Sequence, residues 1–324
     1  MYNFYTTSYN MFVHQALGKL LEEGVTVAPR GQVTRELRAV TFEIADPTAR
    51  TMTLARRNSN IFATVAETLW FLGGRNDLDF VKPYLPRYED YSDDGTILHG
   101  AYGARMLHWN GVDQLHSVLE RLAEDPMSRR AVIILYNPAL DNSPSKDIPC
   151  NNWLQFLIRG DQLHLHVVQR SQDVIWGGTI DVFQWTVLQE LVAGWLGLRL
   201  GQYTHFVGSL HLYERHFDRG KRIIEESLES AYLPRPLAIS CARFDFETII
   251  RTCFVLEAEA RHLREPKLTE LPTGWFREAI RMLWSYHVLR QNNLGLAKEI
   301  LAAVECPALR HAGALYINRF GTGD

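Results

Sequence analysis

Closely spaced cysteines, an excess of charge of one sign and long apolar runs are all missing from this sequence of 324 residues. The four cysteines are far apart and form no CxxC pair, which disfavours a structural zinc site or a disulfide framework and fits a reducing cytoplasm. The formal net charge is only -3, whereas a protein that binds nucleic-acid phosphates is normally more basic. We therefore expect a small anionic ligand and no nucleic-acid partner.

Charged residues interrupt every apolar run well before the roughly 18 residues that a membrane span requires. The first residues, MYNFYTTSYNMF, lack the cationic segment and apolar core of a signal peptide. What is present is ordinary globular composition, 46% hydrophobic and 22% charged, in a chain long enough to bury a sizeable core. These features predict a cytoplasmic protein without membrane contact.

Hydrophobic periodicity predicts a mixture of helices and strands over the first 240 residues. Helical spacing is found at residues 8–23, 61–72, 112–123, 181–196 and 211–227. Strand patterns are found at 37–44, 130–136, 203–207 and in a hairpin at 153–170, whereas 84–103 is predicted to be a loop. From 244 to 317 nearly every residue is compatible with a helix. The sequence thus predicts an α+β domain over residues 1–240 and a helical extension over 241–324.

One cysteine lies in a setting that suits a nucleophile. The segment PCNNWLQF places Cys150 after a proline at the start of the predicted hairpin, and Arg170 lies near the end of the returning strand. A guanidinium close to a thiol stabilises the thiolate, which is the reactive form, and it can also bind an anion through two hydrogen bonds. The alternatives are a buried structural cysteine and a surface ion pair.

Further arginines indicate a phosphate site, because the guanidinium geometry matches phosphate. Arg129 and Arg130 begin the predicted strand 130–136, and Arg30 and Ser171 are the other candidates. Alternation along a strand would put Arg129 and Arg130 on opposite faces, so both reach one phosphate only if the backbone is irregular there. A solvated pair of surface arginines is the alternative.

Several separated motifs together resemble the thymidylate synthase family. In the family's order they are PRGQVTREL, AETLWFLGG, GAYGAR, DPMSRRAVIILYNP, PCNNWLQF, LHLHVVQRSQDVIWGGTIDVFQW and VAGWLGLRLGQYTHFVGSLHLYERH, across residues 10–235. The resemblance implies an α+β fold with a large twisted mixed sheet, packed sheet to sheet in a homodimer. It also implies chemistry at C5 of a pyrimidine nucleoside monophosphate, with 5,10-methylenetetrahydrofolate as the one-carbon donor and no metal.

The resemblance also assigns roles to individual residues. Cys150 would add to C6 of the base, Glu67 would organise water and protons, and Tyr102 would be the active-site tyrosine. The expected nucleotide ligands are Arg30, Gln169, Arg170 and Ser171 for one subunit, Arg129 and Arg130 for the phosphate of the partner subunit, and His211 and Tyr213 for the sugar hydroxyl. The expected folate ligands are Asp173, Trp176 and Gly177. Taken singly, Glu67 could be a solvated helix carboxylate, Tyr102 a packing residue in a loop and His211 a core histidine.

The most informative departure from the family pattern is Asp181 in GGTIDVFQW, where thymidylate synthases have an asparagine facing uracil. An amide donates once and accepts once, which matches N3–H and O4 of uracil. A carboxylate instead accepts from the amino group of cytosine, as in the deoxycytidylate hydroxymethylases that this sequence resembles at the position. It also opposes O4 of uracil, which the site would therefore reject. The alternative is that Asp181 caps the N-terminus of its predicted helix.

Three further departures bear on the reaction. Asn151 replaces a histidine, Trp176 replaces a smaller residue, and the sequence ends in INRFGTGD rather than in the short apolar tail that closes synthase sites. A less closed site admits water, which favours a hydroxymethyl product over hydride transfer to a methyl group. The sequence thus predicts a cytidylate 5-hydroxymethylase acting on dCMP or CMP. The alternatives are a divergent thymidylate synthase that methylates dUMP and an inactive relative that binds nucleotide or RNA.

Overall fold

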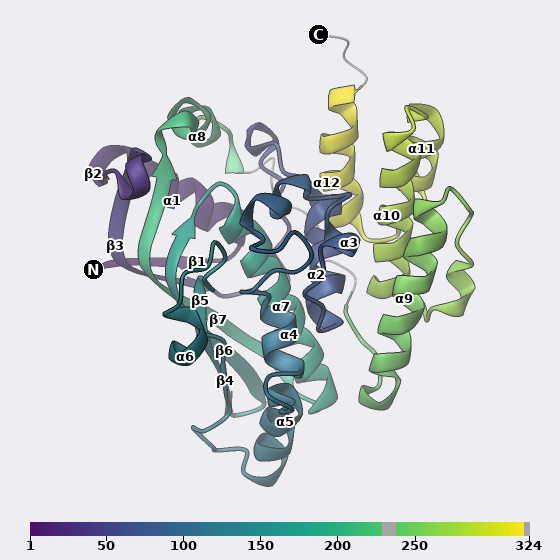
Figure 1. Cartoon of the computed structure of the whole chain (residues 1–324), viewed down its shortest axis with the longest axis horizontal. Coiled ribbons are helices and arrows are strands. Elements are labelled where there is room, and N and C mark those ends of the chain that lie inside the picture. The colour runs from purple at the N-terminus through teal and green to yellow at the C-terminus, as the bar shows by residue number, and fades with distance from the viewer. Residues whose placement is uncertain (229–237, 321–324) are drawn as a thin grey trace.

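The computed structural model describes residues 1–228 and 238–320, which form a seven-stranded mixed sheet and the helices that pack on it (Figure 1). The strands are β1 (Tyr2–Thr6), β2 (Val25–Val27), β3 (Thr34–Ile44), β4 (Val132–Ile134), β5 (Asn151–Arg159), β6 (Gln162–Asp173) and β7 (Arg199–Tyr213). Their order is β1-β3-β7-β6-β5-β4, and β2 pairs with β3. The pairs β1/β3 and β6/β7 are parallel and the others antiparallel, so the predicted mixed sheet is confirmed.

The helices before residue 229 are α1 (Tyr9–Glu23), α2 (Ile61–Leu72), α3 (Leu78–Val81), α4 (Tyr102–Leu107), α5 (Gln114–Glu124), α6 (Pro138–Asp141), α7 (Gly177–Trp195) and α8 (Phe217–Ile224). Those after residue 237 are α9 (Phe246–Arg261), α10 (Trp275–Arg290), α11 (Leu294–Ala302) and α12 (Pro307–Ile317). Short 3-10 turns include η1 (Pro29–Gly31) and η3 (Pro86–Tyr91). Among the described residues, no helix has the length and apolarity of a membrane span.

Local signals placed several of these elements correctly. The predicted helix 61–72 coincides with α2, and α1 begins after Ser8, whose side chain accepts from the backbone N–H of Met11. The hairpin around Gly160 is present as β5 and β6, and the C-terminal region is helical.

Other boundaries were wrong, mainly around β7. Residues 211–227 are not one helix, because β7 continues to Tyr213 and α8 begins at Phe217. The alternating burial along β7 explains the longer strand, since every second side chain faces the helices. The predicted strand 130–136 is only β4, at the edge of the sheet, and β1 and β2 were missed.

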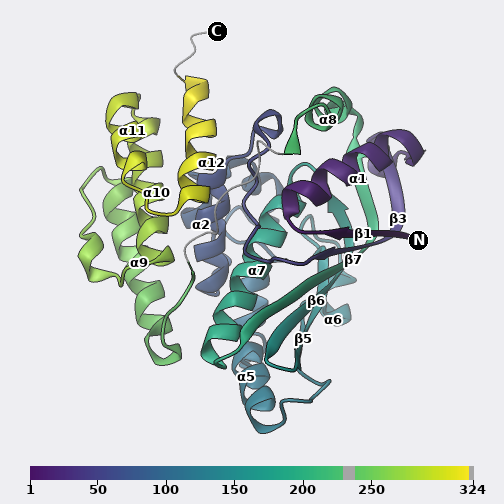
Figure 2. The ribbon, with the colours of Figure 1, turned by 180° about the vertical axis from the view of Figure 1, so that it is seen from behind.

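Two buried helices join the sheet to the C-terminal region. Helix α7 packs against β6 and β7, and α2 packs against α7. All residues of α2 are buried, because α9, α10 and α12 cover its remaining surface (Figures 1 and 2). Buried side chains of both regions belong to one hydrophobic cluster. The division into domains at residue 240 remains a prediction.

Close packing of α4 on α2 generates the first test. A Cβ at Gly103 would overlap the backbone carbonyl of Phe71, which no side-chain movement can relieve. We expect Gly103→Ala to lower the free energy of unfolding by about 2–3 kcal/mol, measured by urea denaturation. Gly18 in α1 has no heavy atom within 4 Å of the equivalent position, so Gly18→Ala should be neutral or stabilising. Equal stability of the two variants would contradict this packing.

Candidate active site

The β5–β6 hairpin brings Cys150 next to Arg170. Asn151 is paired with Gln169 across the two strands, and the backbone N–H of Arg170 donates to the carbonyl oxygen of Cys150 at 2.9 Å. The Arg170 guanidinium donates to the carbonyl oxygens of Pro149 at 2.9 Å and Ile148 at 2.8 Å. Arg170 therefore holds the backbone that leads to Cys150.

The electrostatic effect of Arg170 on the thiol is weaker than expected. Burial raises the pKa of the Cys150 thiol to about 11, and the positive charges of Arg170 and Arg30 only partly oppose it. Asp181 and Asp147 raise this pKa further. The neutral thiol is thus the main form near pH 7, and Arg170 alone does not make Cys150 a thiolate.

Asp181 lies inside α7 and is not a helix cap. Helix α7 begins at Gly177 after Trp176, so the N-cap alternative was wrong. Asp181 is 7% exposed, and its Oδ2 accepts from Gln169 Nε2 at 2.8 Å while its Oδ1 accepts from Gln184 Nε2 at 3.3 Å. Gln169 in turn accepts from Gln172 Nε2 at 2.9 Å. A chain of buried amides from β6 therefore fixes this carboxyl.

Burial raises the pKa of Asp181 to about 7, and the neighbouring amides of Gln169 and Asn151 only partly oppose this. Both the neutral acid and the carboxylate are thus accessible near pH 7.

Glu67 is a second buried acid near Asp181. We call the group that it forms with Cys150, Asn151, Asp181 and Tyr102 the active-site cluster. Glu67 lies within α2 and is 8% exposed, so it is not a solvated helix carboxylate. Burial raises its pKa to about 8, Tyr88 lowers it, and Asp181 and Asp147 raise it further. The Tyr88 hydroxyl donates to Glu67 Oε2 at 2.7 Å. Tyr88 was missed because its segment was predicted only as a loop.

Tyr102 and Asn151 link the two acids of this cluster to Cys150. The Tyr102 hydroxyl accepts from the backbone N–H of Asn151 at 3.4 Å, and its ring packs on Trp185. Asn151 is fully buried beside Asp181, yet neither polar atom of its side chain has a hydrogen bond of ordinary geometry to a described residue. An unsatisfied buried amide is unfavourable, which makes Asn151 a candidate ligand residue. Its place next to Cys150 was the signal for it.

The candidate phosphate arginines are not all in one place. Arg30 is exposed in η1 with a left-handed φ of 52°, and its charge reaches both Cys150 and Tyr213. Arg129 and Arg130 are exposed and precede β4, so strand alternation does not apply to them. The β4–β5 register pairs Val132 with Gln155 and Ile134 with Trp153, which puts both arginines at the end of β5 far from Cys150. Their action on a partner subunit remains a prediction.

The candidate sugar and folate residues lie at the ends of β6 and β7. The β6–β7 register pairs Ser171 with Ser209 and Asp173 with His211, whose ring meets Tyr213 edge to face at 5.1 Å. His211 is half-buried in β7, so it is not a core histidine.

The turn after Asp173 begins α7. Asp173 Oδ1 accepts from the N–H of Ile175 at 2.8 Å, and Trp176 donates to His216 Nε2 at 2.9 Å. Gly177 has open space around it, whereas a Cβ at Gly178 would lie 2.8 Å from the Tyr9 hydroxyl. At the start of α7 the space is therefore too small for a side chain at position 178 but not at position 177.

Arg57, which was also missed, lies beneath the exposed ring of Trp176. It is 2% exposed, with its Cζ 5.1 Å from the centre of that ring and one hydrogen bond of 3.4 Å to Thr179. Burial lowers its pKa to about 10, so it stays charged near pH 7. Its Nε and Nη1 have no partner among the described residues, and neither does Nη1 of Arg219. These donors beside an indole fit a ligand with an aromatic ring and a carboxylate, as folates have.

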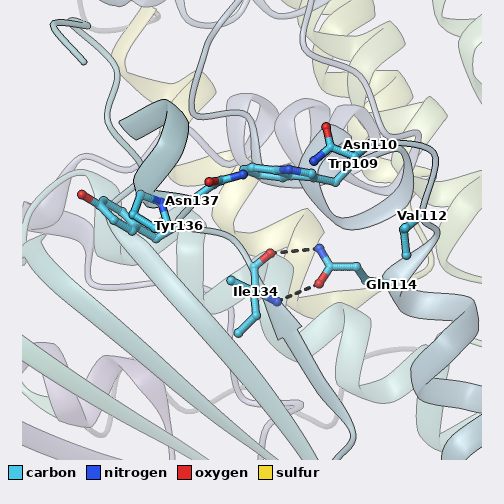
Figure 3. A pocket seen from close by; sticks show the side chains of 8 residues that line it. Trp109, Asn110, Val112, Gln114, Ile134, Tyr136 and Asn137 are labelled. Carbon is cyan, nitrogen blue, oxygen red and sulfur yellow. Dashed lines mark hydrogen bonds between the residues drawn. The ribbon is translucent and has the colours of Figure 1, made fainter. Parts of the chain in front are cut away.

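A separate hollow of about 340 Å³ contains none of the predicted site residues. Figure 3 shows Trp109 and Tyr136 on its wall and the Gln114 amide bonded to the backbone N–H and carbonyl of Ile134, both at 2.9 Å. Gln114 thus supplies hydrogen-bond partners for the backbone of Ile134 in the edge strand β4. Among residues 1–228 and 238–320, no group of three or more histidine, cysteine, aspartate or glutamate side chains is placed to hold a metal.

Comparison with known proteins identifies the family. The family model for thymidylate synthase matches residues 13–249. The chain belongs to the thymidylate synthase family.

Three curated relatives are named deoxyuridylate hydroxymethyltransferase. The protein of Bacillus phage SP01 is 37% identical over 239 residues, which is 70% of this chain and 62% of that protein. Those of Delftia phage PhiW-14 and Pseudomonas phage M6 are 41% and 36% identical, covering 56% and 62% of this chain and 54% and 58% of the relatives. The chain thus spans little more than half the length of these relatives, whose names specify uridylate rather than the expected cytidylate.

The geometry around Cys150 predicts that its sulfur is indispensable. We expect Cys150→Ser to reduce turnover by at least about 10³-fold, because a serine hydroxyl in the same position is a far weaker nucleophile. Nucleotide affinity, measured by calorimetry, should change little. Turnover near the wild-type rate would exclude Cys150 as the nucleophile.

The position of the Arg57 guanidinium predicts that its loss weakens folate binding without affecting nucleotide binding. We expect Arg57→Gln to raise the KM for methylenetetrahydrofolate about 10-fold or more and to leave the nucleotide Kd unchanged, because a charge-assisted hydrogen bond contributes roughly 1.5–3 kcal/mol. Arg56→Gln is the matched control, since Arg56 is exposed and pairs with Glu225. Equal effects of the two changes would contradict a folate role for Arg57.

Proposed function

We propose that this chain hydroxymethylates C5 of a cytidine monophosphate, dCMP or CMP, with 5,10-methylenetetrahydrofolate as the one-carbon donor. The observation that carries the proposal is the Asp181 carboxyl, buried between Gln169 and Gln184 in the same cluster as Cys150. Its oxygens accept from these two amides and still have lone pairs for a further donor, which the 4-amino group of cytosine supplies.

The protonation state of Asp181 decides which base it complements. The neutral acid donates to N3 of cytosine while accepting from its amino group, and it can equally donate to O4 and accept from N3–H of uracil. The carboxylate accepts from the cytosine amino group, and also from N3 once N3 takes up a proton as the sulfur adds to C6. With uracil it accepts from N3–H but opposes O4. With a pKa of about 7, Asp181 therefore favours cytosine increasingly as the pH rises.

The remaining residues supply the steps of the reaction. The Cys150 thiol gives up its proton to a base and its sulfur bonds to C6, which makes C5 nucleophilic. C5 then bonds to the one-carbon unit and loses its proton, and the bond from that carbon to the folate nitrogen breaks, so that tetrahydrofolate leaves. Methylenetetrahydrofolate supplies that carbon at the oxidation level of formaldehyde. Water adds to the new exocyclic carbon as the sulfur–C6 bond breaks. Glu67, with a pKa of about 8, can both donate and accept a proton near neutral pH.

Hydroxymethylation of dUMP is the second candidate, and the names of the three phage relatives favour it. In its neutral form Asp181 presents one donor and one acceptor, as the asparagine of thymidylate synthases does. The two candidates share Cys150 and the folate and differ only in the base.

The free face of the sheet supports a homodimer. Trp153, Val168 and Phe206 lie side by side across β5, β6 and β7, and each is half-buried, whereas Leu154, Val167 and Val207 on the opposite face are fully buried. A second copy packed on this face would cover the row and bring the partner's arginines toward the site. A cytoplasmic location is part of the same proposal.

The test compares release of tritium from C5 of dCMP, CMP and dUMP between pH 6 and pH 8.5. We expect a preference for cytosine that grows above the Asp181 pKa of about 7 and reverses by about 10²-fold in Asp181→Asn. Asp218→Asn, which changes an exposed carboxylate in α8, is the control. A preference for dUMP that Asp181→Asn leaves unchanged would overturn the cytosine assignment, and formation of dihydrofolate would indicate a thymidylate synthase. Nucleotide binding without product would indicate an inactive relative.

A further inference from the structure

Side chains of α9 and α10 hold α3 and the segment that connects it to η3. Arg261 donates to the carbonyl oxygens of Asp79 at 2.7 Å and Phe80 at 3.0 Å. The Tyr286 hydroxyl donates to the carbonyl oxygen of Pro83 at 3.1 Å. Helices far away in the sequence thus satisfy backbone groups of this segment directly.

Tyr84 is the centre of this attachment. Its hydroxyl lies 2.6 Å from Glu257 Oε1 and 2.7 Å from His287 Nε2, and His287 lies 3.1 Å from the same Glu257 oxygen. Tyr84 and Glu257 are each 2% exposed and His287 is 7% exposed. Burial opposes ionisation of Glu257, but His287, Arg261 and Tyr84 together keep its pKa below the usual range. A satisfied buried network of this kind fixes one geometry, because any rearrangement leaves a charge unpaired.

Backbone hydrogen bonds connect Tyr84 to the active-site cluster. The N–H groups of Tyr84 and Leu85 donate to the carbonyl oxygen of Val81 at 3.0 and 2.9 Å, and the N–H of Tyr88 donates to that of Leu85 at 3.0 Å. Tyr88 then donates to Glu67 at 2.7 Å. The titratable groups that act on Glu67 are Tyr88, Asp181 and Asp147. Of these three groups only Tyr88 favours the ionised form of Glu67, so the position of Tyr88 matters for proton transfer.

We propose that Tyr84, Glu257 and His287 are positioning residues for the reaction, and that they fix the segment which presents Tyr88 to Glu67. The proposal rests on the proposed function only in the role of Glu67 as the group that moves protons. It gives helices α9 and α10 a part in the active site through the α3–η3 segment.

The test measures ionisation of Glu67 directly, by carbon NMR of labelled glutamate, with Glu67→Gln identifying the signal. Removing the Tyr88 hydrogen bond removes an influence that lowers the Glu67 pKa, so Tyr88→Phe should shift the titration to higher pH. We expect Tyr84→Phe to shift it in the same direction by a smaller amount and to lower kcat on the order of 10-fold, with little change in nucleotide KM. The double variant should shift no further than Tyr88→Phe alone, because both act through one contact.

Ser285→Ala is the matched control. Ser285 is a buried residue of α10 that donates to the carbonyl oxygen of Ala297 in α11 at 2.7 Å, so its loss destabilises the same helix without touching the α3–η3 segment. It should lower stability and leave the Glu67 titration unchanged. The proposal is overturned if Tyr84→Phe lowers stability alone, or if the Tyr84 and Tyr88 shifts simply add. Since NMR needs no turnover, absence of activity toward all three nucleotides would count against the proposed function and leave this test intact.

Discussion

The Asp181 carboxyl and its two amide partners form the contact on which the rest of the site depends. Gln169 comes from β6 and Gln184 from α7, so this contact joins the sheet to its central helix at the level of Cys150. The carboxyl is held in place before any ligand arrives. Its oxygens still have lone pairs for a base, and a fixed acceptor in a buried position discriminates strongly between donors and acceptors.

Burial shapes the chemistry of the whole cluster. It raises the pKa values of Cys150, Glu67, Asp181 and Tyr102 together, so all four groups resist carrying charge. A thiol with a pKa of about 11 reacts only when a proton acceptor is supplied or when the negative charges of Asp181 and Asp147 that face it are neutralised. The two acids, Asp181 and Glu67, have pKa values of about 7 and 8 and therefore exchange protons readily near neutral pH. The difference in pKa between the nucleophile and the two acids follows from how deeply each group is buried and from the charges that face it.

Local sequence signals predicted the elements that begin and end at clear caps and turns. Helix α2 has apolar residues all round and an Asn60 cap, and the hairpin at Gly160 has an unambiguous turn. The role of Asp181 toward the base remains a prediction, which rests on one side chain and one base edge. By contrast, β7 was predicted too short because many residues of its half-buried face are polar, and nothing in the sequence distinguishes the buried Arg57 from its exposed neighbour Arg56. Tyr88 gains its importance from Glu67, which only tertiary packing brings to it.

The central claim, that Asp181 reads the amino edge of a pyrimidine held at Cys150, is tested most directly by a crystal structure of the Cys150→Ser protein with dCMP. We predict an Asp181 oxygen at roughly 3 Å from N4 of the base, with C6 beside residue 150. A complex in which Asp181 keeps only Gln169 and Gln184 as partners, with the amino group turned toward other residues, would contradict the claim.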